Sequence, residues 1–193
     1  MAEVPSTFQL TPGAFAPTFA LSDAAGTIYA PGSLIAERRG LLVIFVCNHC
    51  PYVIHLADAL GQFADEIDTR GIATVAIASN DVERYPQDGP DHMPAFAEAH
   101  AWHFPYLHDA TQEVAHAYAA ACTPDFYLFD GDLRLVYAGQ FDDSRPGSGK
   151  ATGSDLARAV ENLLADHETP QPWYPSTGCN IKWRPGNEPD YFG

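Results

Sequence analysis

Two cysteines three residues apart, Cys47 and Cys50, are the residues in this sequence best suited to chemistry. Residues three apart share one face of a helix, so the two sulfur atoms can come within bonding distance. The first turn of a helix also has unpaired N–H groups and the positive end of the helix dipole, and both stabilise a thiolate. We therefore expect Cys47 to ionise below the ordinary cysteine pKa of about 8.5, and the pair to be redox-active.

His49 lies between the two cysteines and is expected to tune their ionisation. If it is protonated, its positive charge favours the thiolate of Cys47. A stabilised thiolate favours the reduced pair, which makes the corresponding disulfide a stronger oxidant. Pro51 fits the start of a helix, because it gives up only an N–H group that has no partner there.

The segments that must position these residues alternate between predicted strands and helices. Residues 41–46 are continuously apolar, which is typical of a strand buried on both faces. Residues 49–69 carry apolar side chains at helical spacing and are followed by Gly71, which predicts a helix and its end. Further strands are expected at 19–23, 24–29, 72–78, 104–107, 125–130 and 133–138, and further helices at 93–102, 111–121 and 154–165. This order predicts an α/β fold with a central mixed sheet flanked by helices and extended by an N-terminal β-hairpin.

The length of 193 residues fits one domain of about 150 residues with an appendage. We expect a domain over residues 1–168 and a C-terminal tail over residues 169–193. The tail is rich in proline, yet it keeps aromatic residues such as Trp173 and Trp183. Disordered segments are usually poor in aromatic residues, so the tail is expected to pack on the domain or on a partner.

Composition excludes several classes of partner. Ten Lys and Arg residues against 25 Asp and Glu residues give a formal net charge of −15, which would repel nucleic acid and anionic membranes. The N-terminus lacks the basic start and apolar run of a secretory signal, and no apolar stretch approaches the ~18 residues of a membrane span. We therefore expect a cytoplasmic protein, in which cysteines serve catalysis or metal binding more often than structural disulfides.

A second motif, Cys122-Thr123-Pro124, comes directly before the strand expected at 125–130. In a fold of this order, a cis-proline at that point faces the helix that carries the cysteine pair. A cis bond there would leave the preceding backbone N–H and C=O groups free to pair with an extended, cysteine-bearing substrate.

Together these motifs resemble the thioredoxin-like superfamily and, within it, the redoxin branch of alkyl hydroperoxide reductase and thiol-specific antioxidant proteins. The resemblance covers roughly residues 14–165 and includes the lead-in hairpin, the Cys47–Cys50 motif and Thr123-Pro124. It implies a thiol–disulfide oxidoreductase in which Cys47 attacks, Cys50 resolves, and Thr123 and Pro124 form the substrate platform. No cofactor or metal is implied, and the expected partners are thiols and disulfides of proteins or small molecules.

Two other functions stay open. In a thiol peroxidase, Cys47 would be oxidised to a sulfenic acid that Cys50 resolves. Ile44 occupies the position where the peroxidase pattern has Thr or Ser three residues before the cysteine, and this favours disulfide exchange. A copper- or zinc-binding module would use thiolates and an imidazole. Its candidate ligands are Cys47, Cys50, Cys122 and either His49 or His55.

The remaining cysteines, Cys122 and Cys179, have three open interpretations. They could be additional redox residues, they could form a disulfide that ties the tail across the active site, or they could be inert buried thiols.

Overall fold

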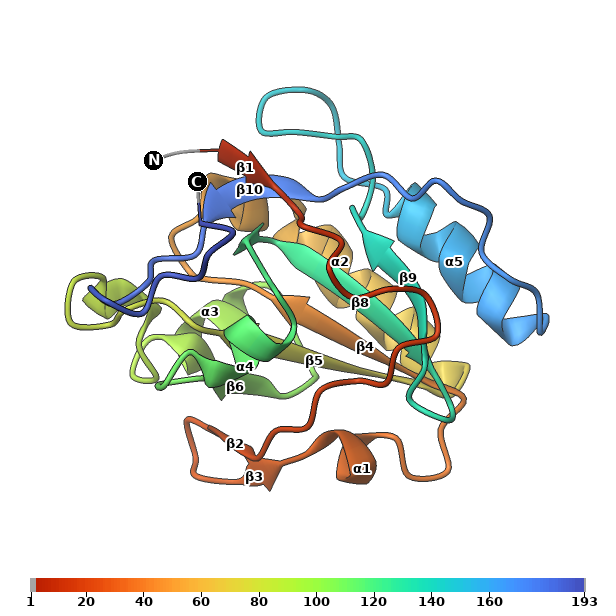
Figure 1. Ribbon diagram of the computed structural model, residues 1–193, viewed down its shortest axis with the longest axis horizontal. Coiled ribbons are helices and arrows are strands. Elements are labelled where there is room, and N and C mark those ends of the chain that lie inside the picture. The colour runs from red at the N-terminus through yellow and green to blue at the C-terminus, as the bar shows by residue number, and fades with distance from the viewer. Residues whose placement is uncertain (1–2, 193) are drawn as a thin grey trace.

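The computed structural model describes residues 3–192 and has a seven-stranded mixed sheet at its centre (Figure 1). Its strands are β2 (Leu21–Asp23), β3 (Ile28–Tyr29), β4 (Gly40–Phe45), β5 (Ile72–Ala78), β6 (Tyr106–His108), β8 (Asp125–Asp130) and β9 (Leu135–Gly139). The strand order is β3-β2-β6-β5-β4-β8-β9. β4 pairs in parallel with β5 and antiparallel with β8, so the mixed central sheet expected from the sequence is confirmed. β2 and β3 form the expected N-terminal hairpin at one edge.

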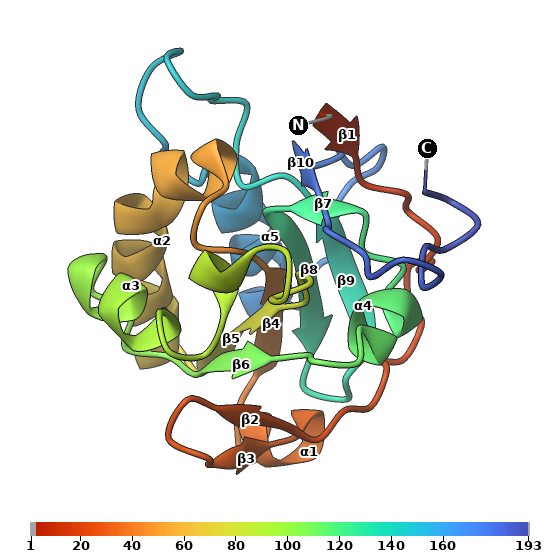
Figure 2. The same cartoon turned by 90° about the vertical axis from the view of Figure 1, so that its left-hand side faces the viewer.

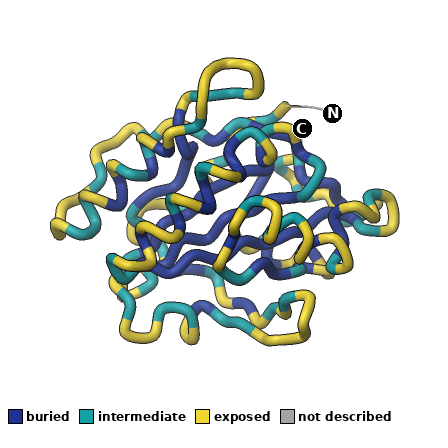
Figure 3. The backbone as a smooth tube through the Cα atoms, turned by 180° about the vertical axis from the view of Figure 1, so that it is seen from behind, coloured by how far each residue is buried: buried dark blue, intermediate teal, exposed yellow. Residues whose placement is uncertain are grey.

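The central strands are buried because helices and loops cover both faces of the sheet. Every residue of β4 and β5 is buried (Figure 3), which explains why all but Thr74 are apolar or glycine. Alternate residues of a strand point to opposite faces. Leu42 and Ile44 therefore pack on one side with Leu56 of the longest helix, whereas Val43 and Phe45 pack on the other.

Helices of very different lengths cover the two faces. They are α1 (Pro31–Leu34), α2 (Pro51–Thr69), α3 (Met93–Ala99), α4 (Glu113–Ala117) and α5 (Ser154–Leu164), with a 3-10 turn η1 (Pro86–Asp88). α2 and α5 pack on one face and α4 on the other, and Figure 2 shows α2 and α4 on opposite sides of the central strands. Among residues 3–192, no helix is long and apolar enough to cross a membrane.

α3 and α4 are shorter than the apolar spacing predicts. The helix expected at 93–102 ends at Ala99, and Ala101 has a left-handed φ of 52°. The helix expected at 111–121 covers only Glu113–Ala117, and Ala119 has a φ of 50°. A left-handed residue stops the helical hydrogen-bond pattern, and sequence spacing does not reveal one unless it is a glycine.

A second, three-stranded sheet joins segments from both ends of the chain. It consists of β1 (Glu3–Pro5), β10 (Thr177–Asn180) and β7 (Cys122–Thr123), in the order β1-β10-β7. β10 pairs antiparallel with both neighbours. Figures 1 and 2 both show β10 beside β1, above the central sheet. The sequence predicted none of these three strands.

Candidate active site

The cysteine pair lies in the segment that connects β4 to α2. Cys47 follows β4, and Cys50 is the N-cap residue of α2, directly before Pro51. Both cysteines are buried, with exposed fractions of 1% and 0%. The elements that cover them are η1 on one side and the paired strands β7 and β10 on the other, as the contacts below show.

Thr123 of β7 contacts both sulfur atoms of the pair. Its hydroxyl oxygen lies 3.5 Å from the Sγ of Cys47. Its carbonyl oxygen lies 3.1 Å from the Sγ of Cys50, which donates to it when protonated. The two thiols also hydrogen-bond each other, and no disulfide joins them. The pair is thus in its reduced form, with the sulfur atoms close together.

The two thiols do not ionise alike. The hydrogen bond from Cys47 lowers the pKa of Cys50 to about 5. The backbone N–H groups of Val53 and Cys179 act on it in the same direction. By contrast, the bond to Cys50, burial and the negative charge of Asp88 raise the pKa of Cys47 well above its usual value. These contacts favour a thiolate on Cys50, the residue at the helix N-terminus, whereas the sequence favours one on Cys47.

This ionisation gives the reduced protein a distinct pH dependence. We expect the ultraviolet absorbance of one thiolate to persist on acidification and to disappear only as pH falls through about 5. The same group adds to the free energy of unfolding as pH rises from about 5 towards the unfolded cysteine value of about 8.5. That contribution is lost as pH falls through the folded pKa. Absorbance titration of the wild type and of Cys50→Ser, which should lose the transition, checks this expectation.

Cys122→Ser is the matched control for this titration, since Cys122 has a raised pKa caused chiefly by burial and is expected to stay protonated. A thiolate that appears only near pH 8 to 9 in the wild type would contradict the assignment.

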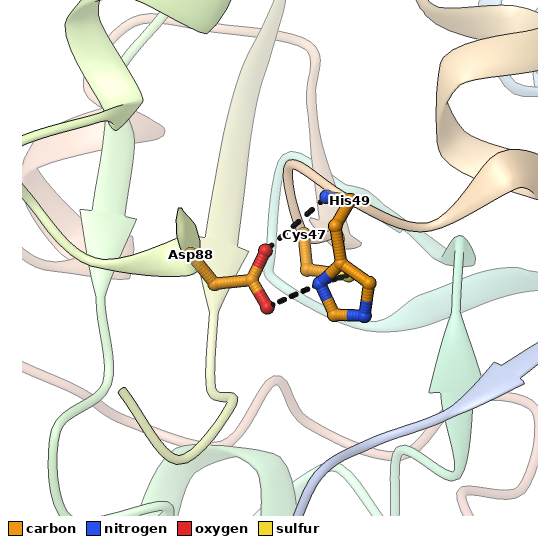
Figure 4. Close-up of side chains that lie close together, drawn as sticks. All are labelled: Cys47, His49 and Asp88. Atoms are coloured by element: carbon orange, nitrogen blue, oxygen red, sulfur yellow. Dashed lines mark hydrogen bonds and ion pairs between the residues drawn. The ribbon is translucent and has the colours of Figure 1, made fainter. Parts of the chain in front are cut away.

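Asp88 of η1 holds the loop that carries Cys47 in place through hydrogen bonds, a clamp that the sequence did not predict. Its side chain is fully buried and accepts four hydrogen bonds. Oδ1 accepts from the backbone N–H groups of Asn48 at 2.9 Å and His49 at 3.2 Å. Oδ2 accepts from the His49 ring at 2.7 Å (Figure 4). It also accepts from the Asn80 amide at 2.8 Å. Asp88 lies in a loop of Pro, Gly and Asp residues, where no periodicity or motif distinguishes it.

His49 faces Asp88 more closely than it faces Cys47. Its Nδ1 lies 2.7 Å from Asp88 Oδ2 and 3.9 Å from the Sγ of Cys47 (Figure 4). The ring stacks on Tyr85, with centroids 5.5 Å apart and planes 5° apart. His49 therefore lies nearer to a carboxylate than to the Cys47 thiol that it is expected to tune. The imidazole acts as a partly exposed cover over Cys47, with 18% of its side chain accessible.

The Thr123–Pro124 peptide bond is cis, as expected, but its neighbouring backbone is not free. β10 pairs with β7 so that Cys179 lies opposite Thr123, and Asn180 lies opposite Cys122. The expectation of an open platform for a substrate strand is therefore corrected, because a segment of the same chain occupies that edge.

Cys122 and Cys179 point in different directions, which argues against the disulfide between them. Directly opposed residues of a strand pair share a face, and residues one position apart do not. Cys179 shares its face with Thr123 and hydrogen-bonds Cys50. Cys122 lies on the other face, where its Sγ is 3.6 Å from the Pro124 carbonyl and burial raises its pKa.

The candidate metal ligands are not all brought together. Cys122 faces away from the pair, and His55 Nε2 lies 2.9 Å from the hydroxyl of Ser144. The potential ligand atoms of Cys47, His49 and Asp88 do lie within 4.8 Å of one another. Asp88 already accepts hydrogen bonds on both oxygens there, one of them from the His49 ring.

Comparison with known proteins identifies the family. A sequence model of the AhpC/TSA family matches residues 12–138. The chain belongs to the AhpC/TSA family. Membership places it in the class of thiol–disulfide oxidoreductases and thiol peroxidases, and it confirms the redoxin branch that the motifs indicated.

Two solved structures resemble this AhpC/TSA protein over nearly its whole length. A hypothetical protein from Sinorhizobium meliloti 1021 is 45% identical, with a TM-score of 0.91 over 94% of this chain and 99% of that one. An uncharacterized conserved protein from Geobacillus kaustophilus is 44% identical, with a TM-score of 0.92 over 96% and 98% of the two chains. The chain matches none of the curated proteins with which it was compared.

More distant structures show the fold alone, and that fold is thioredoxin-like. A secreted Mycobacterium tuberculosis disulfide oxidoreductase homologous to E. coli DsbE is 18% identical, with a TM-score of 0.57 over 74% of this chain and 94% of that one. Peroxidoxin BcpB from the same organism is also 18% identical, with a TM-score of 0.61 over 81% and 98% of the chains.

Proposed function

We propose that this AhpC/TSA protein is a thiol–disulfide oxidoreductase whose Cys47 and Cys50 cycle between dithiol and disulfide. The observation that carries the proposal is the hydrogen bond between two buried thiols, which lowers the pKa of Cys50 together with the backbone N–H groups of Val53 and Cys179. A disulfide between them accepts two electrons when it is reduced to two thiols, so the reaction needs no organic cofactor.

Cys47 is the sulfur that we assign to the substrate. The Cys50 sulfur is enclosed by the Thr123 carbonyl and by Cys179. Cys47 is covered on one side by the His49 ring, which is partly exposed. A substrate disulfide would therefore meet Cys47 once the ring has turned aside.

The proposed reaction has two exchange steps. Cys47 passes its proton to the Cys50 thiolate along their hydrogen bond and attacks one substrate sulfur, so that the other substrate sulfur leaves as a thiolate. Cys50 then loses its proton and attacks the Cys47 sulfur, and the second substrate thiolate leaves. The substrate disulfide is reduced to two thiols while the pair becomes a disulfide, and the reverse sequence oxidises a dithiol.

The low pKa of Cys50 supports an oxidising pair. A thiolate that is stable at neutral pH lowers the free energy of the reduced form, which raises the reduction potential of the disulfide. The expected partners are thiols and disulfides that reach the site past His49 and Tyr85. Tyr85 also lines a surface hollow together with Asn180 and Lys182.

A thiol peroxidase is the second candidate, supported by family membership and by the Thr123 hydroxyl 3.5 Å from the Sγ of Cys47. The raised pKa of Cys47 opposes it, because peroxide reacts with the thiolate and not with the thiol.

Parallel oxidation by glutathione disulfide and by hydrogen peroxide tests the proposal. We expect glutathione disulfide to convert the reduced pair into a Cys47–Cys50 disulfide in a two-electron equilibrium, detected as the loss of two alkylatable thiols. We expect peroxide to react no faster than it does with glutathione itself. Faster reaction with peroxide would favour the peroxidase, and a pair that resists both oxidants would overturn the proposed chemistry.

A further inference from the structure

β10 brings a third thiol to the cysteine pair. Cys179 lies opposite Thr123 in the β10–β7 pairing, so the two side chains share one face of the small sheet. That face is turned towards the active site, since the Thr123 hydroxyl lies 3.5 Å from the Sγ of Cys47. Cys179 is itself buried, with 4% of its surface exposed.

Cys179 contacts Cys50 in two ways. Its backbone N–H group hydrogen-bonds the Cys50 sulfur, and its own thiol hydrogen-bonds that sulfur as well. Cys50 therefore stands between two thiols, those of Cys47 and Cys179. Both contacts are with the sulfur that takes part in the proposed disulfide.

Close packing holds Cys179 in this place. Gly178 lies so close to β7 that a Cβ atom on it would collide with the carbonyl group of Thr123. On either side of β10, the Ser176 hydroxyl donates to the Gly139 carbonyl at 2.5 Å, and the Ile181 N–H group donates to the Ala121 carbonyl at 3.0 Å. β10 is thus an integral strand that keeps its cysteine at the pair.

We propose that Cys179 is a third redox residue, which takes over the disulfide from Cys47 and holds it as Cys50–Cys179. The proposal rests on the proposed function of the pair. In this step the Cys179 sulfur loses its proton and attacks Cys50, so that a Cys50–Cys179 bond forms and the Cys47–Cys50 bond breaks. Cys47 leaves as a thiolate and takes up a proton. No electrons are gained or lost, because one disulfide replaces another.

The charges around Cys179 support this order of events. In the reduced protein, burial and then the neighbouring Cys50 raise the pKa of Cys179 to about 12, which keeps it protonated. When Cys50 enters a disulfide, its negative charge is gone, and Lys182 still acts to lower the pKa of Cys179. Cys179 is therefore an unreactive thiol while the pair is reduced, and it becomes a better nucleophile once the pair is oxidised.

The transfer would move the disulfide away from Cys47, the sulfur that substrates reach. Substrate thiols that reach Cys47 could reverse a Cys47–Cys50 disulfide directly. A Cys50–Cys179 disulfide lies behind the Thr123 carbonyl and beneath β10, so that it persists until Cys47 attacks Cys50 again.

Peptide mapping of the oxidised, full-length protein tests the proposal. The protein is oxidised with glutathione disulfide, quenched in acid, alkylated and digested with trypsin. Cys47 and Cys50 lie on one peptide between Arg39 and Arg70, and Cys179 lies on another that ends at Lys182. We expect the wild type to give a cross-linked pair of these peptides in addition to the internal Cys47–Cys50 link.

Cys179→Ser should lose the cross-linked pair and keep the internal link, whereas Cys122→Ser should keep both. A wild type that contains only the internal link overturns the role of Cys179 and leaves the proposed function intact. Loss of the internal link in Cys179→Ser would instead count against the proposed function. Gly178→Ala should reduce the cross-linked fraction relative to Gly32→Ala, which places its methyl group in open space.

Discussion

Replacing Cys47 by Ser is expected to lower the rate of insulin-disulfide reduction by a thousandfold or more, on the order seen when a nucleophile is removed from an enzyme. Cys47 is the sulfur that we assign to the mixed disulfide, and Ser cannot form one. Cys50→Ser should also stop turnover, but for a different reason: the mixed disulfide at Cys47 forms and is not resolved. Mass spectrometry of Cys50→Ser after incubation with a disulfide substrate should therefore show the trapped adduct.

Cys122→Ser serves as the control, because its side chain faces away from the pair and should leave the rate unchanged. Full insulin reduction by both Cys47→Ser and Cys50→Ser would remove the basis for the assigned roles.

Replacing Asp88 by Ala is expected to lower the free energy of unfolding by about 3 kcal/mol or more. The substitution leaves the N–H groups of Asn48 and His49, the His49 ring and the Asn80 amide without their acceptor. It also removes a negative charge that raises the pKa of Cys47, so alkylation of Cys47 should accelerate. Urea unfolding and the iodoacetamide rate measure the two effects.

Two variants separate charge from hydrogen bonding. Asp88→Asn keeps an oxygen that can accept from the two backbone N–H groups, so it should lose less stability while still accelerating alkylation of Cys47. Asp68→Ala removes an exposed carboxylate that pairs with Arg38, and it should cost less than about 1 kcal/mol. If Asp88→Ala costs no more than Asp68→Ala, the clamp that we assign to Asp88 does not exist.

The parts of the fold that were predictable are those with strong local periodicity. β5 and β8 coincide with the strands expected at 72–78 and 125–130, and Gly71 follows the end of α2. β1, β7 and β10 have two to four residues each, too few to show alternation. Their pairing joins residues as distant as Glu3 and Cys179, and no local pattern records such a contact.

The ionisation of the cysteines was only partly predictable for a related reason. The sequence supported a helix N-terminus that stabilises a thiolate, and the structure has one. The helix begins at Pro51, however, so its free N–H groups lie nearest to Cys50, and Cys47 remains outside the helix. The carboxylate that opposes ionisation of Cys47 comes from Asp88. Asp88 lies about 40 residues away in the sequence, in a loop without a recognisable motif or periodicity.

The strand that covers Cys50 is synthesised long after Cys50 itself. Cys50 leaves the ribosome more than 100 residues before Cys179, so the central strands can pair while the thiols still lack their cover. Oxidants in the surroundings can reach Cys50 of the nascent chain directly, whereas in the finished protein they meet Cys47 first. A non-native disulfide of Cys50 formed at that stage would be covered when β10 docks, so refolding of this protein calls for a reductant that is withdrawn only after β10 is in place.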